Sequence, residues 1–330
     1  MVENNSPGQN SYPQLARHLK AAGDPLRLEI LRVLARDSYG VLELSRIFDM
    51  KQSGMSHHLK VLSGAGLVAT RREGNSIFYR RAAPARGAET ERLQTVLFST
   101  LDRQPLPASI STRLADIQSE RATASKQFFA ENAAKFREQQ DLIASFPVYA
   151  EQVQELLAQT PLPGTACALE VGPGEGEFLA VLAPRFEQVV ALDNAAAMLE
   201  QAQAQAAREG LDNVTFVCGD TGEARRDQLV TADCVVVNMV LHHTPSPAAM
   251  FQDINALLRP GGAVLITDLC RHDQNWARTA CGDLWLGFDP EDFSNWAASA
   301  GLEEGQSVYF ALRNGFQIQL RQFFKRAATG

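Results

Sequence analysis

The sequence predicts a chain of two parts, a mostly helical first part and an α/β second part built on a parallel sheet. The length of 330 residues, with 45% hydrophobic and 21% charged residues, favours two globular domains over one. After Thr165, β-type runs alternate with helical stretches, which predicts βαβ units. Before Thr165 helical periodicity dominates, and the clear β-type runs lie within 68–81.

These patterns divide the chain into four segments. We expect residues 1–13 to be disordered, 14–84 to form the first domain, 85–160 to form a helical connector and 161–330 to form the second domain. The connector must bury surface, because it carries apolar residues at helical spacing. Two roles for the connector stay open: packing in a dimer, or capping of the second domain. The apolar residues available on a dimer-packing helix are Leu93, Val96, Leu97 and Leu101.

The first domain is predicted to contain three helices in succession. Asp24 can act as the N-cap of the first, with Pro25 at its first position. A second helix at 41–48 leads through a tight connection into a third helix. In that third helix Met55, Leu59 and Leu62 share one face, and Gly64 and Gly66 end it.

A β-hairpin follows these helices. The runs at 68–72 and 77–81 are β-type and basic. Between them, Gly74-Asn75 can supply the left-handed conformations of a tight turn.

The second domain is predicted to hold five parallel strands and a final hairpin. The β-type runs are 166–171, 188–193, 214–220, 233–240 and 263–269, with a helix before the fifth ending at 259–262. A further helix at 290–300 precedes two last strands that turn at Asn314-Gly315.

The charge is unevenly distributed along the chain. The net charge is -7, but residues 1–85 hold 12 Lys and Arg against 7 Asp and Glu, whereas residues 155–330 hold 11 against 22. A polyanion would therefore bind the first domain. No apolar run approaches membrane-spanning length and no secretory signal is visible, so we expect a cytoplasmic protein. The five cysteines have no C-x-x-C spacing and are expected to be free thiols.

A glycine-rich loop gives the sharpest local signal. Residues 170–176, Glu-Val-Gly-Pro-Gly-Glu-Gly, stand where a predicted strand ends and a helix begins. Glycines at this spacing permit a tight turn and a close approach of backbone to ligand. Asp193 ends the next strand, where a carboxylate can accept hydrogen bonds from both ribose hydroxyls, and Asp220 ends the third, where it can accept from an adenine amine.

This pattern resembles the class I S-adenosylmethionine-dependent methyltransferases over about residues 164–326. The resemblance implies a Rossmann-like seven-stranded sheet with an antiparallel last strand, and S-adenosylmethionine or S-adenosylhomocysteine as the ligand. It implies that Glu170 holds the ligand's ammonium group, Asn238 its amino-acid part and His243 a wall of the sulfur pocket. The cofactor-binding residues so implied are Glu170, Gly172, Gly174, Gly176, Asp193, Asn194, Asp220, Thr221, Asn238 and His243.

The segment 238–243 resembles the L-H-H segment of small-molecule methyltransferases. The pair His242-His243 suggests a metal site or a general base. Adjacent residues rarely ligate one ion without help, and no second cluster has a ligand spacing, so no metal is predicted and no catalytic residue is assigned. Residues 128–136 resemble the aromatic helix that covers such sites, although Phe129 and Phe136 suit a hydrophobic core equally well.

Residues 53–62, followed by the 64–68 boundary and the basic hairpin, resemble the ArsR family of winged helix-turn-helix repressors. The resemblance covers about residues 15–81 and implies a homodimer that binds double-stranded DNA. The alternative is that a charged hairpin serves protein contacts. The pair of cysteines typical of the family's metal sensors is missing from 40–44, so metal sensing there is not expected. The DNA-binding residues predicted are Gln52, Ser53, Ser56, His57, Lys60, Arg71, Arg72 and Arg80, with Arg81 also beside the wing.

Three functions remain open. Proteins that join these two halves resemble S-adenosylhomocysteine-responsive regulators of the methionine cycle, which makes a ligand-controlled transcription regulator, most simply a repressor, our first hypothesis. The second is an active methyltransferase of a small molecule with an autoregulatory DNA-binding domain; arsenite is one acceptor, with Cys218, Cys270 and Cys281 as possible thiolates. The third is a domain that only supports dimerisation, which the retained Asp193 and Asp220 disfavour.

Overall fold

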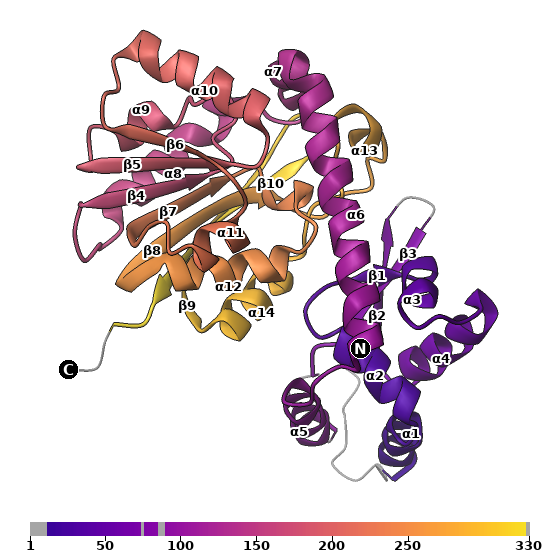
Figure 1. Cartoon of the computed structure of the whole chain (residues 1–330). Coiled ribbons are helices and arrows are strands. Elements are labelled where there is room, and N and C mark those ends of the chain that lie inside the picture. The colour runs from indigo at the N-terminus through magenta and orange to yellow at the C-terminus, as the bar shows by residue number, and fades with distance from the viewer. Residues whose placement is uncertain (1–11, 74–75, 85–89, 328–330) are drawn as a thin grey trace, which may run out of the picture. The chain divides into compact units, whose positions relative to one another are not determined.

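The computed structural model describes residues 12–73, 76–84 and 90–327 (Figure 1). The chain forms two compact units, residues 1–118 and 119–330, and the boundary between them falls inside helix α6 (Ala108–Asn132). The expected connector is therefore divided between the units, and helix α1 begins at Tyr12, inside the segment expected to be disordered. Residues 1–11 and the Gly74-Asn75 turn lie outside the described residues. Across the described ranges, no helix combines the length and apolarity needed to cross a membrane.

The first unit contains the predicted helices and hairpin. Its three strands form an antiparallel sheet in the order β1-β3-β2. Its elements are α1 (Tyr12–Ala22), α2 (Pro25–Val33), β1 (Tyr39–Gly40), α3 (Val41–Ile47), α4 (Gln52–Gly64), β2 (Val68–Glu73), β3 (Ser76–Arg81) and α5 (Glu91–Asp102), and it includes the start of α6.

Local sequence explains where these helices begin and end. Asp24 caps α2 as predicted, accepting the N–H of Arg27 at 3.0 Å, with Pro25 in the first turn. Asp49 has a φ of 50°, which forms the tight connection between α3 and α4. Gly66 has a φ of 73° just after α4 ends, a conformation that favours glycine.

The core of the first unit is formed by the inner faces of its helices. Met55, Leu59 and Leu62 of α4 are buried, as their spacing predicted. On α5, Leu101 is buried and Val96 remains exposed. The other fully buried side chains of this core include Ile30, Leu31, Leu34, Tyr39, Leu44, Ile47 and Leu67.

The second unit is a seven-stranded sheet covered by helices. After α6 come a 3₁₀ turn (Ala133–Lys135) and α7 (Phe136–Asp141). The remaining elements are α8 (Phe146–Gln159), β4 (Cys167–Val171), α9 (Leu179–Leu182), β5 (Gln188–Asp193), α10 (Ala196–Glu209), β6 (Val214–Cys218), α11 (Thr221–Arg226), β7 (Ala232–Asn238), a 3₁₀ turn (Leu241–His243), α12 (Pro247–Leu257), β8 (Leu258–Leu269), α13 (Trp276–Ala280), α14 (Pro290–Ala300), β9 (Leu302–Ala311) and β10 (Gln317–Lys325).

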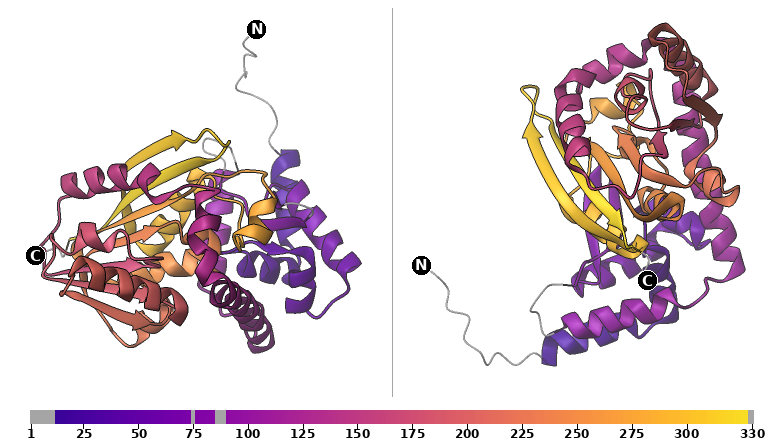
Figure 2. Two further views of the ribbon diagram at one scale, coloured as in Figure 1. Left: turned by 90° about the horizontal axis from the view of Figure 1, so that it is seen from above. Right: turned by 90° about the vertical axis from the view of Figure 1, so that its left-hand side faces the viewer.

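The sheet has the predicted Rossmann-like topology. Its order is β6-β5-β4-β7-β8-β10-β9, with the first five strands parallel. The last strand, β10, runs antiparallel to both β8 and β9, which confirms the expected antiparallel last strand. Helices α8, α9 and α10 cover one face and α11, α12 and α14 the other (Figure 1), and Figure 2 shows the long β9–β10 hairpin at one side.

Two element boundaries in the second unit lie at prolines. Pro147 lies in the first turn of α8 and starts that helix, as the missing N–H of proline allows. Residues 259–262 belong to the start of β8 and do not end the preceding helix, which stops at Leu257. Helix α8 packs into the core of the second unit through Tyr149, Val153, Leu156 and Leu157.

Gly287 and Gly210 form a matched pair for testing the packing of the second unit. Both have a φ of 67°; a Cβ at Gly287 would lie 2.2 Å from the backbone oxygen of Cys270, whereas a Cβ at Gly210 would meet nothing within 4 Å. We expect Gly210→Ala to lower the free energy of unfolding by about 1–2 kcal/mol, the cost of the left-handed conformation. Gly287→Ala should cost about 1–3 kcal/mol more, because it adds a backbone clash. Urea denaturation measures both values, and equal losses would contradict the close approach.

Candidate functional site

The polar residues singled out in the second domain lie at the carboxyl edge of its parallel strands. Gly172 follows β4, Asp193 ends β5, Asp220 follows β6 and Asn238 ends β7. These strands are neighbours in the order β6-β5-β4-β7. The chain places β5 and β6 on one side of β4 and then returns to place β7 on the other side. Ligands bind in open α/β sheets at such an edge, outside the carboxyl ends of the strands.

The loop after β4 requires its three glycines. Gly172, Gly174 and Gly176 have φ values of 66°, 59° and 84°, all in the left-handed region. A Cβ on Gly172 would lie 2.5 Å from Cγ2 of Val240, and a Cβ on Gly176 would lie 3.0 Å from Cα of Ala202. The glycines therefore permit both the turn and the close approach of the loop to neighbouring segments.

Glu170 is a buried carboxyl group directly before this loop. Its side chain is 2% exposed, and its Oε2 atom has no hydrogen-bond partner among the described residues. Burial raises the pKa of Glu170 to about 8, because removal from water disfavours the charged carboxylate. A ligand cation at this point would supply that stabilisation.

Asp193 has a fixed orientation at the end of β5. Its Oδ1 atom accepts the backbone N–H of Ala195 at 2.8 Å. Burial raises the pKa of Asp193 to about 6, while the N–H groups of Ala195 and Asn194 act in the opposite direction. The neighbouring Asn194 is half-buried, so both predicted residues lie at the edge of the sheet.

Asp220 and Thr221 take part in the start of α11. Asp220 is exposed and caps the helix, because its Oδ1 atom accepts the N–H of Glu223 at 2.8 Å. Thr221 is buried, and its hydroxyl donates to Oδ2 of Asp253 at 3.0 Å. That hydroxyl therefore has a partner within the fold, which does not favour the expected contact of the Thr221 side chain with adenine.

Asn238 and Thr267 carry buried polar atoms at the ends of the paired strands β7 and β8. The two residues are in register. The Oδ1 and Nδ2 atoms of Asn238 and the Oγ1 atom of Thr267 have no hydrogen-bond partner among the described residues. Met239 follows with a φ of 58°, an uncommon conformation for a residue with a side chain that clusters at functional sites. Thr267 could not be found from the sequence, because its register with Asn238 comes from strand pairing.

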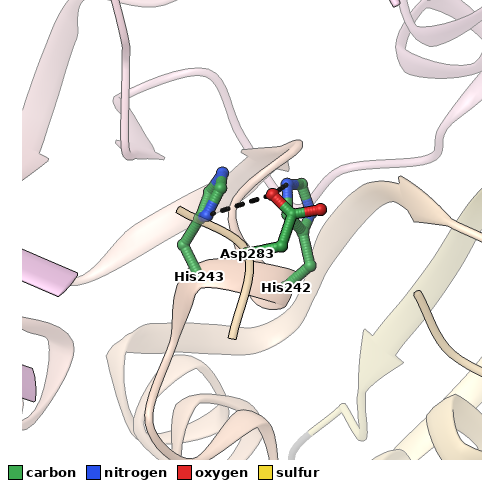
Figure 3. Close-up of side chains that lie close together, drawn as sticks. All are labelled: His242, His243 and Asp283. Atoms are coloured by element: carbon green, nitrogen blue, oxygen red, sulfur yellow. Dashed lines mark ion pairs between the residues drawn. The ribbon is translucent and has the colours of Figure 1, made fainter. Parts of the chain in front are cut away.

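His242 is held between two buried aspartates. Its Nδ1 atom lies 2.8 Å from Oδ1 of Asp268. On the other side, its Nε2 atom lies 3.9 Å from Oδ1 of Asp283 (Figure 3). Burial opposes the charged form of the imidazole, but Asp268 and Asp283 outweigh it and raise the pKa of His242. Neither aspartate could be found from the sequence, because they lie 26 and 41 residues further along the chain.

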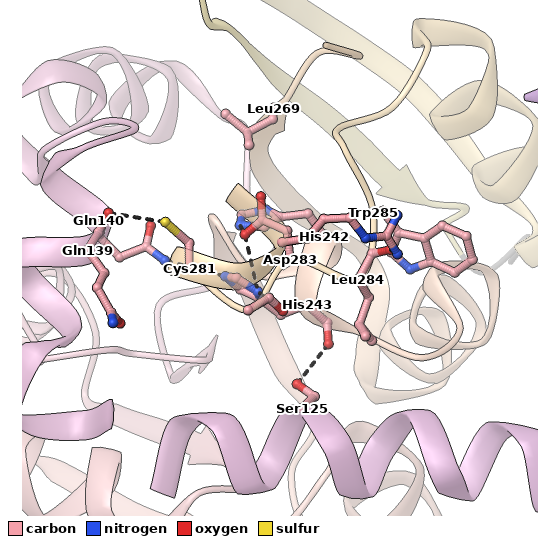
Figure 4. A network of polar contacts seen from close by, with 12 residues as sticks. Ser125, Gln139, Gln140, His242, His243, Leu269, Cys281, Asp283, Leu284 and Trp285 are labelled. Carbon is pink, nitrogen blue, oxygen red and sulfur yellow. Dashed lines mark hydrogen bonds and ion pairs between the residues drawn. The ribbon is translucent and has the colours of Figure 1, made fainter. Parts of the chain in front are cut away.

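His243 lies beside the same aspartate but in a different electrostatic environment. Its Nδ1 atom is 3.8 Å from Oδ1 of Asp283 and 3.3 Å from the backbone oxygen of Gly282. Burial, together with the neighbouring His242, lowers the pKa of His243 well below its usual value. Figure 4 shows the surrounding network, in which the hydroxyl of Ser125 donates to the backbone oxygen of His243 at 3.0 Å.

Phe129 of α6 contacts this region. The ring of Phe129 packs edge-on against His243 with centroids 4.9 Å apart. Phe129 also packs against Ala195 and Met198, just beyond the end of β5. These contacts support the prediction that Phe129 lies over the site, which stays a hypothesis. The side chain of Phe136 is not among the described ones.

The candidate DNA-binding helix is α4. Its buried face is apolar, and its opposite face is polar and exposed, as a recognition helix requires. The exposed side chains on it are the predicted Gln52, Ser53, Ser56, His57 and Lys60.

The arginines of the wing divide into outward and inward groups. Arg72 is exposed and Arg80 half-buried, so both are accessible to phosphates. Arg71 is only 5% exposed, which corrects its expected role at a phosphate. Arg81 also serves the fold, because its guanidinium donates to the backbone oxygen of Leu31 at 2.6 Å and pairs with Asp102 at 2.9 Å.

Comparison with known proteins identifies a regulator in the first unit. Residues 24–70 match the family model for bacterial regulatory proteins of the arsR family. The arsenical resistance operon repressor of Staphylococcus xylosus is 40% identical over 70 residues, which are 21% of this chain and 67% of that protein.

The second unit matches methyltransferases. Residues 168–262 match the family model for a methyltransferase domain. The trans-aconitate 2-methyltransferase of Methylobacterium radiotolerans is 32% identical over 114 residues, and the match covers 34% of this chain and 41% of that enzyme. The solved structure of the [4+2]-cyclase SpnF shares the fold, with a TM-score of 0.50 and 16% identity over 61% of this chain and 95% of that one.

The winged helix and the sheet topology described above agree with both matches. Through its first unit the chain belongs to the arsR family of bacterial regulatory proteins, and it carries a methyltransferase domain fused in its second unit.

Proposed function

We propose that this protein is a transcription regulator whose methyltransferase domain binds S-adenosylmethionine or S-adenosylhomocysteine and couples that ligand to DNA binding. The observation that carries the proposal is the set of buried polar atoms without partners at the carboxyl edge. They belong to Glu170, Asn238 and Thr267. Buried polar groups in folded proteins are nearly always hydrogen-bonded, so a ligand is the natural partner of these atoms.

The chemistry of the edge fits an adenosyl amino acid. Glu170 can pair with the ligand's ammonium group, and Asn238 can both donate to and accept from its amino-acid part. The carboxylate of Asp193 can accept hydrogen bonds from ribose hydroxyls, with one oxygen already fixed by Ala195. Pyrophosphate is disfavoured because the edge is acidic.

Helix α4 supports the DNA-binding half of the proposal. Small polar side chains and Lys60 lie together on its exposed face, where they can reach base edges and phosphates. The named function of the Staphylococcus xylosus relative is repression. We therefore propose that a dimer of this chain represses a promoter with two half-sites.

Helix α6 offers a route for coupling, because the chain passes through it from the first unit into the second. Its residue Ile117 belongs to the core of the first unit, and its residue Ser125 binds the backbone of His243 in the second. A ligand that binds at the carboxyl edge and alters the position of this helix would change the population of DNA-competent dimers. It would do so only if its affinity differs between the two states.

A second candidate function is methyl transfer to a small molecule. The intact glycine loop favours it, since all three glycines adopt the left-handed conformations that the loop requires. Methyl transfer needs mainly positioning of the acceptor and exclusion of water, so few dedicated residues are necessary.

Calorimetric titration of the full-length protein with each nucleoside, with and without DNA from its own promoter, tests the leading proposal. A nucleoside affinity that DNA changes, matched by an equal change in DNA affinity, establishes a ligand-controlled regulator, because coupling is reciprocal. Nucleoside binding that DNA leaves unaltered, with many turnovers of an acceptor per chain, would establish the enzyme instead.

Removal of the Asp193 charge should weaken nucleoside binding. Asp193→Asn keeps an acceptor for the N–H of Ala195 but removes the negative charge from the hydrogen bonds to ribose. The free-energy contribution of each of these hydrogen bonds then falls from about 1.5–3 to about 0.5–1.5 kcal/mol. We expect the dissociation constant to rise about tenfold or more. The exposed Asp212, varied to Asn, is the matched control and should leave the affinity unchanged. Equal affinity of the two variants would argue against the proposed ribose contact.

Nucleoside affinity should increase with pH because of Glu170. Its raised pKa, about 8, means that the free protein holds a proton there at neutral pH, and pairing with an ammonium group releases that proton. The dissociation constant should therefore fall by up to about tenfold per pH unit as the pH rises from about 6.5 to 8. Glu170→Gln should bind more weakly and with a flatter profile. Parallel pH profiles of the dissociation constant for the two proteins would contradict the pairing of Glu170 with the ammonium group.

Lys60 should contribute to DNA binding through a phosphate. We expect Lys60→Ala to weaken binding to specific and unrelated DNA alike and to reduce the slope of log K against log salt by about 1. Lys126, which is exposed on α6, serves as the control for loss of one positive charge. Fluorescence anisotropy at several salt concentrations measures the slope, and equal slopes for both variants would remove Lys60 from the interface.

A further inference from the structure

We propose that His242, His243 and Asp283 form a binding site for a divalent metal ion of the zinc class. Each of the three offers one ligand atom, and these atoms lie within 4.8 Å of one another (Figure 3). All three side chains are buried. The site can be tested without a nucleoside; it shares His243 with the sulfur pocket that the methyltransferase resemblance implies, whereas His242 and Asp283 lie outside the residues assigned to the nucleoside.

The spacing of the three groups fits an ion better than direct hydrogen bonds. Oδ1 of Asp283 is 3.9 Å from Nε2 of His242 and 3.8 Å from Nδ1 of His243. These separations exceed the usual hydrogen-bond range of about 2.7–3.2 Å. An ion with bonds of about 2.0–2.2 Å to each atom would bridge them after side-chain shifts of under about 1 Å.

Asp268 orients His242 as a metal ligand. Its Oδ1 atom lies 2.8 Å from Nδ1 of His242, which assigns the proton to that nitrogen. The Nε2 atom has no hydrogen-bond partner among the described residues, and an ion bound there would take the place of any proton on it. A carboxylate behind a ligating histidine is the usual arrangement around bound zinc.

His243 offers Nδ1 to the ion and has a partner available for its other ring nitrogen. Its Nδ1 atom lies 3.8 Å from Oδ1 of Asp283, a separation that one ion can bridge. Binding through Nδ1 would replace its long contact with the oxygen of Gly282, 3.3 Å away. Its Nε2–H would then donate to the side-chain oxygen of Gln140, since the amide nitrogen now placed 3.4 Å away is interchangeable with that oxygen.

The donor set defines the chemical class of the ion. Two imidazole nitrogens and one carboxylate oxygen suit zinc and neighbouring first-row metals, whereas calcium and magnesium prefer oxygen donors alone. Three protein ligands leave at least one coordination position for water or an acceptor group. The adjacency of the two histidines alone is a weak signal, and Asp283 is the additional ligand that makes the cluster a site.

Titration of the full-length, chelator-treated protein with Co²⁺ tests the proposal through visible absorption, with metal analysis after equilibration with Zn²⁺. We expect one ion per chain and the spectrum of a nitrogen- and oxygen-ligated Co²⁺. Asp283→Asn should weaken binding at least 100-fold, and Asp268→Asn should weaken it about 10- to 100-fold through the orientation of His242. Asp273, an exposed residue outside the cluster, gives the matched control Asp273→Asn, which should bind as the unaltered protein does.

Folding of each variant is checked by circular dichroism and thermal unfolding, and His242→Gln replaces Asp283→Asn if the latter does not fold. Absence of saturable Co²⁺ binding to the folded, unaltered protein overturns the proposal. Binding retained in both Asp283→Asn and His242→Gln, or thiolate charge-transfer bands, would also overturn it. Because no nucleoside is present in these titrations, their result is separate from that of the proposed regulatory function.

Discussion

The close approach of chain segments at the carboxyl edge of the parallel sheet is the constraint on which the second unit depends. Gly172 leaves room for Val240, so the loop after β4 directly contacts the segment after β7. Val240 then accepts the N–H of His243 at 2.9 Å, which forms the turn that places both histidines. A side chain at Gly172 would disturb the nucleoside loop and the histidine turn together.

The same edge concentrates polar groups that are costly to bury. Glu170, Asp268 and Asp283 are each at most 3% exposed, and such carboxyl groups persist in proteins when they are neutralised, paired or bound to a ligand. Asp268 has His242 as its partner, and the pKa of Glu170 shifts to about 8. Burial of this kind costs stability, so its concentration at one edge favours a binding role over a purely structural one.

The sequence predicted the parts of the fold that depend on local chemistry. Three such features were identified correctly: the Asp24 cap, the glycine loop after β4 and the apolar face of α4. Each of them depends on residues that lie only a few positions apart in the sequence. The orientation of Arg71 was wrong, because strand alternation at a short wing does not reveal which face the unit buries. Thr267, Asp268 and Asp283 were missed, because their relation to the histidine turn and to Asn238 depends on strand pairing and on a distant loop.

The charge of the histidine cluster bears on which nucleoside the proposed site would prefer. Without a metal, the cluster contributes two aspartates and one histidine whose pKa is raised, and this balance favours a cationic sulfonium nearby. A divalent ion would neutralise the two aspartates and so remove this preference for the sulfonium over the neutral thioether of S-adenosylhomocysteine. The proposed metal site and the choice between sensing and methyl transfer would then be linked by electrostatics. The strength of that link would depend on the distance between ion and sulfur, because the interaction weakens with separation and with the local dielectric constant.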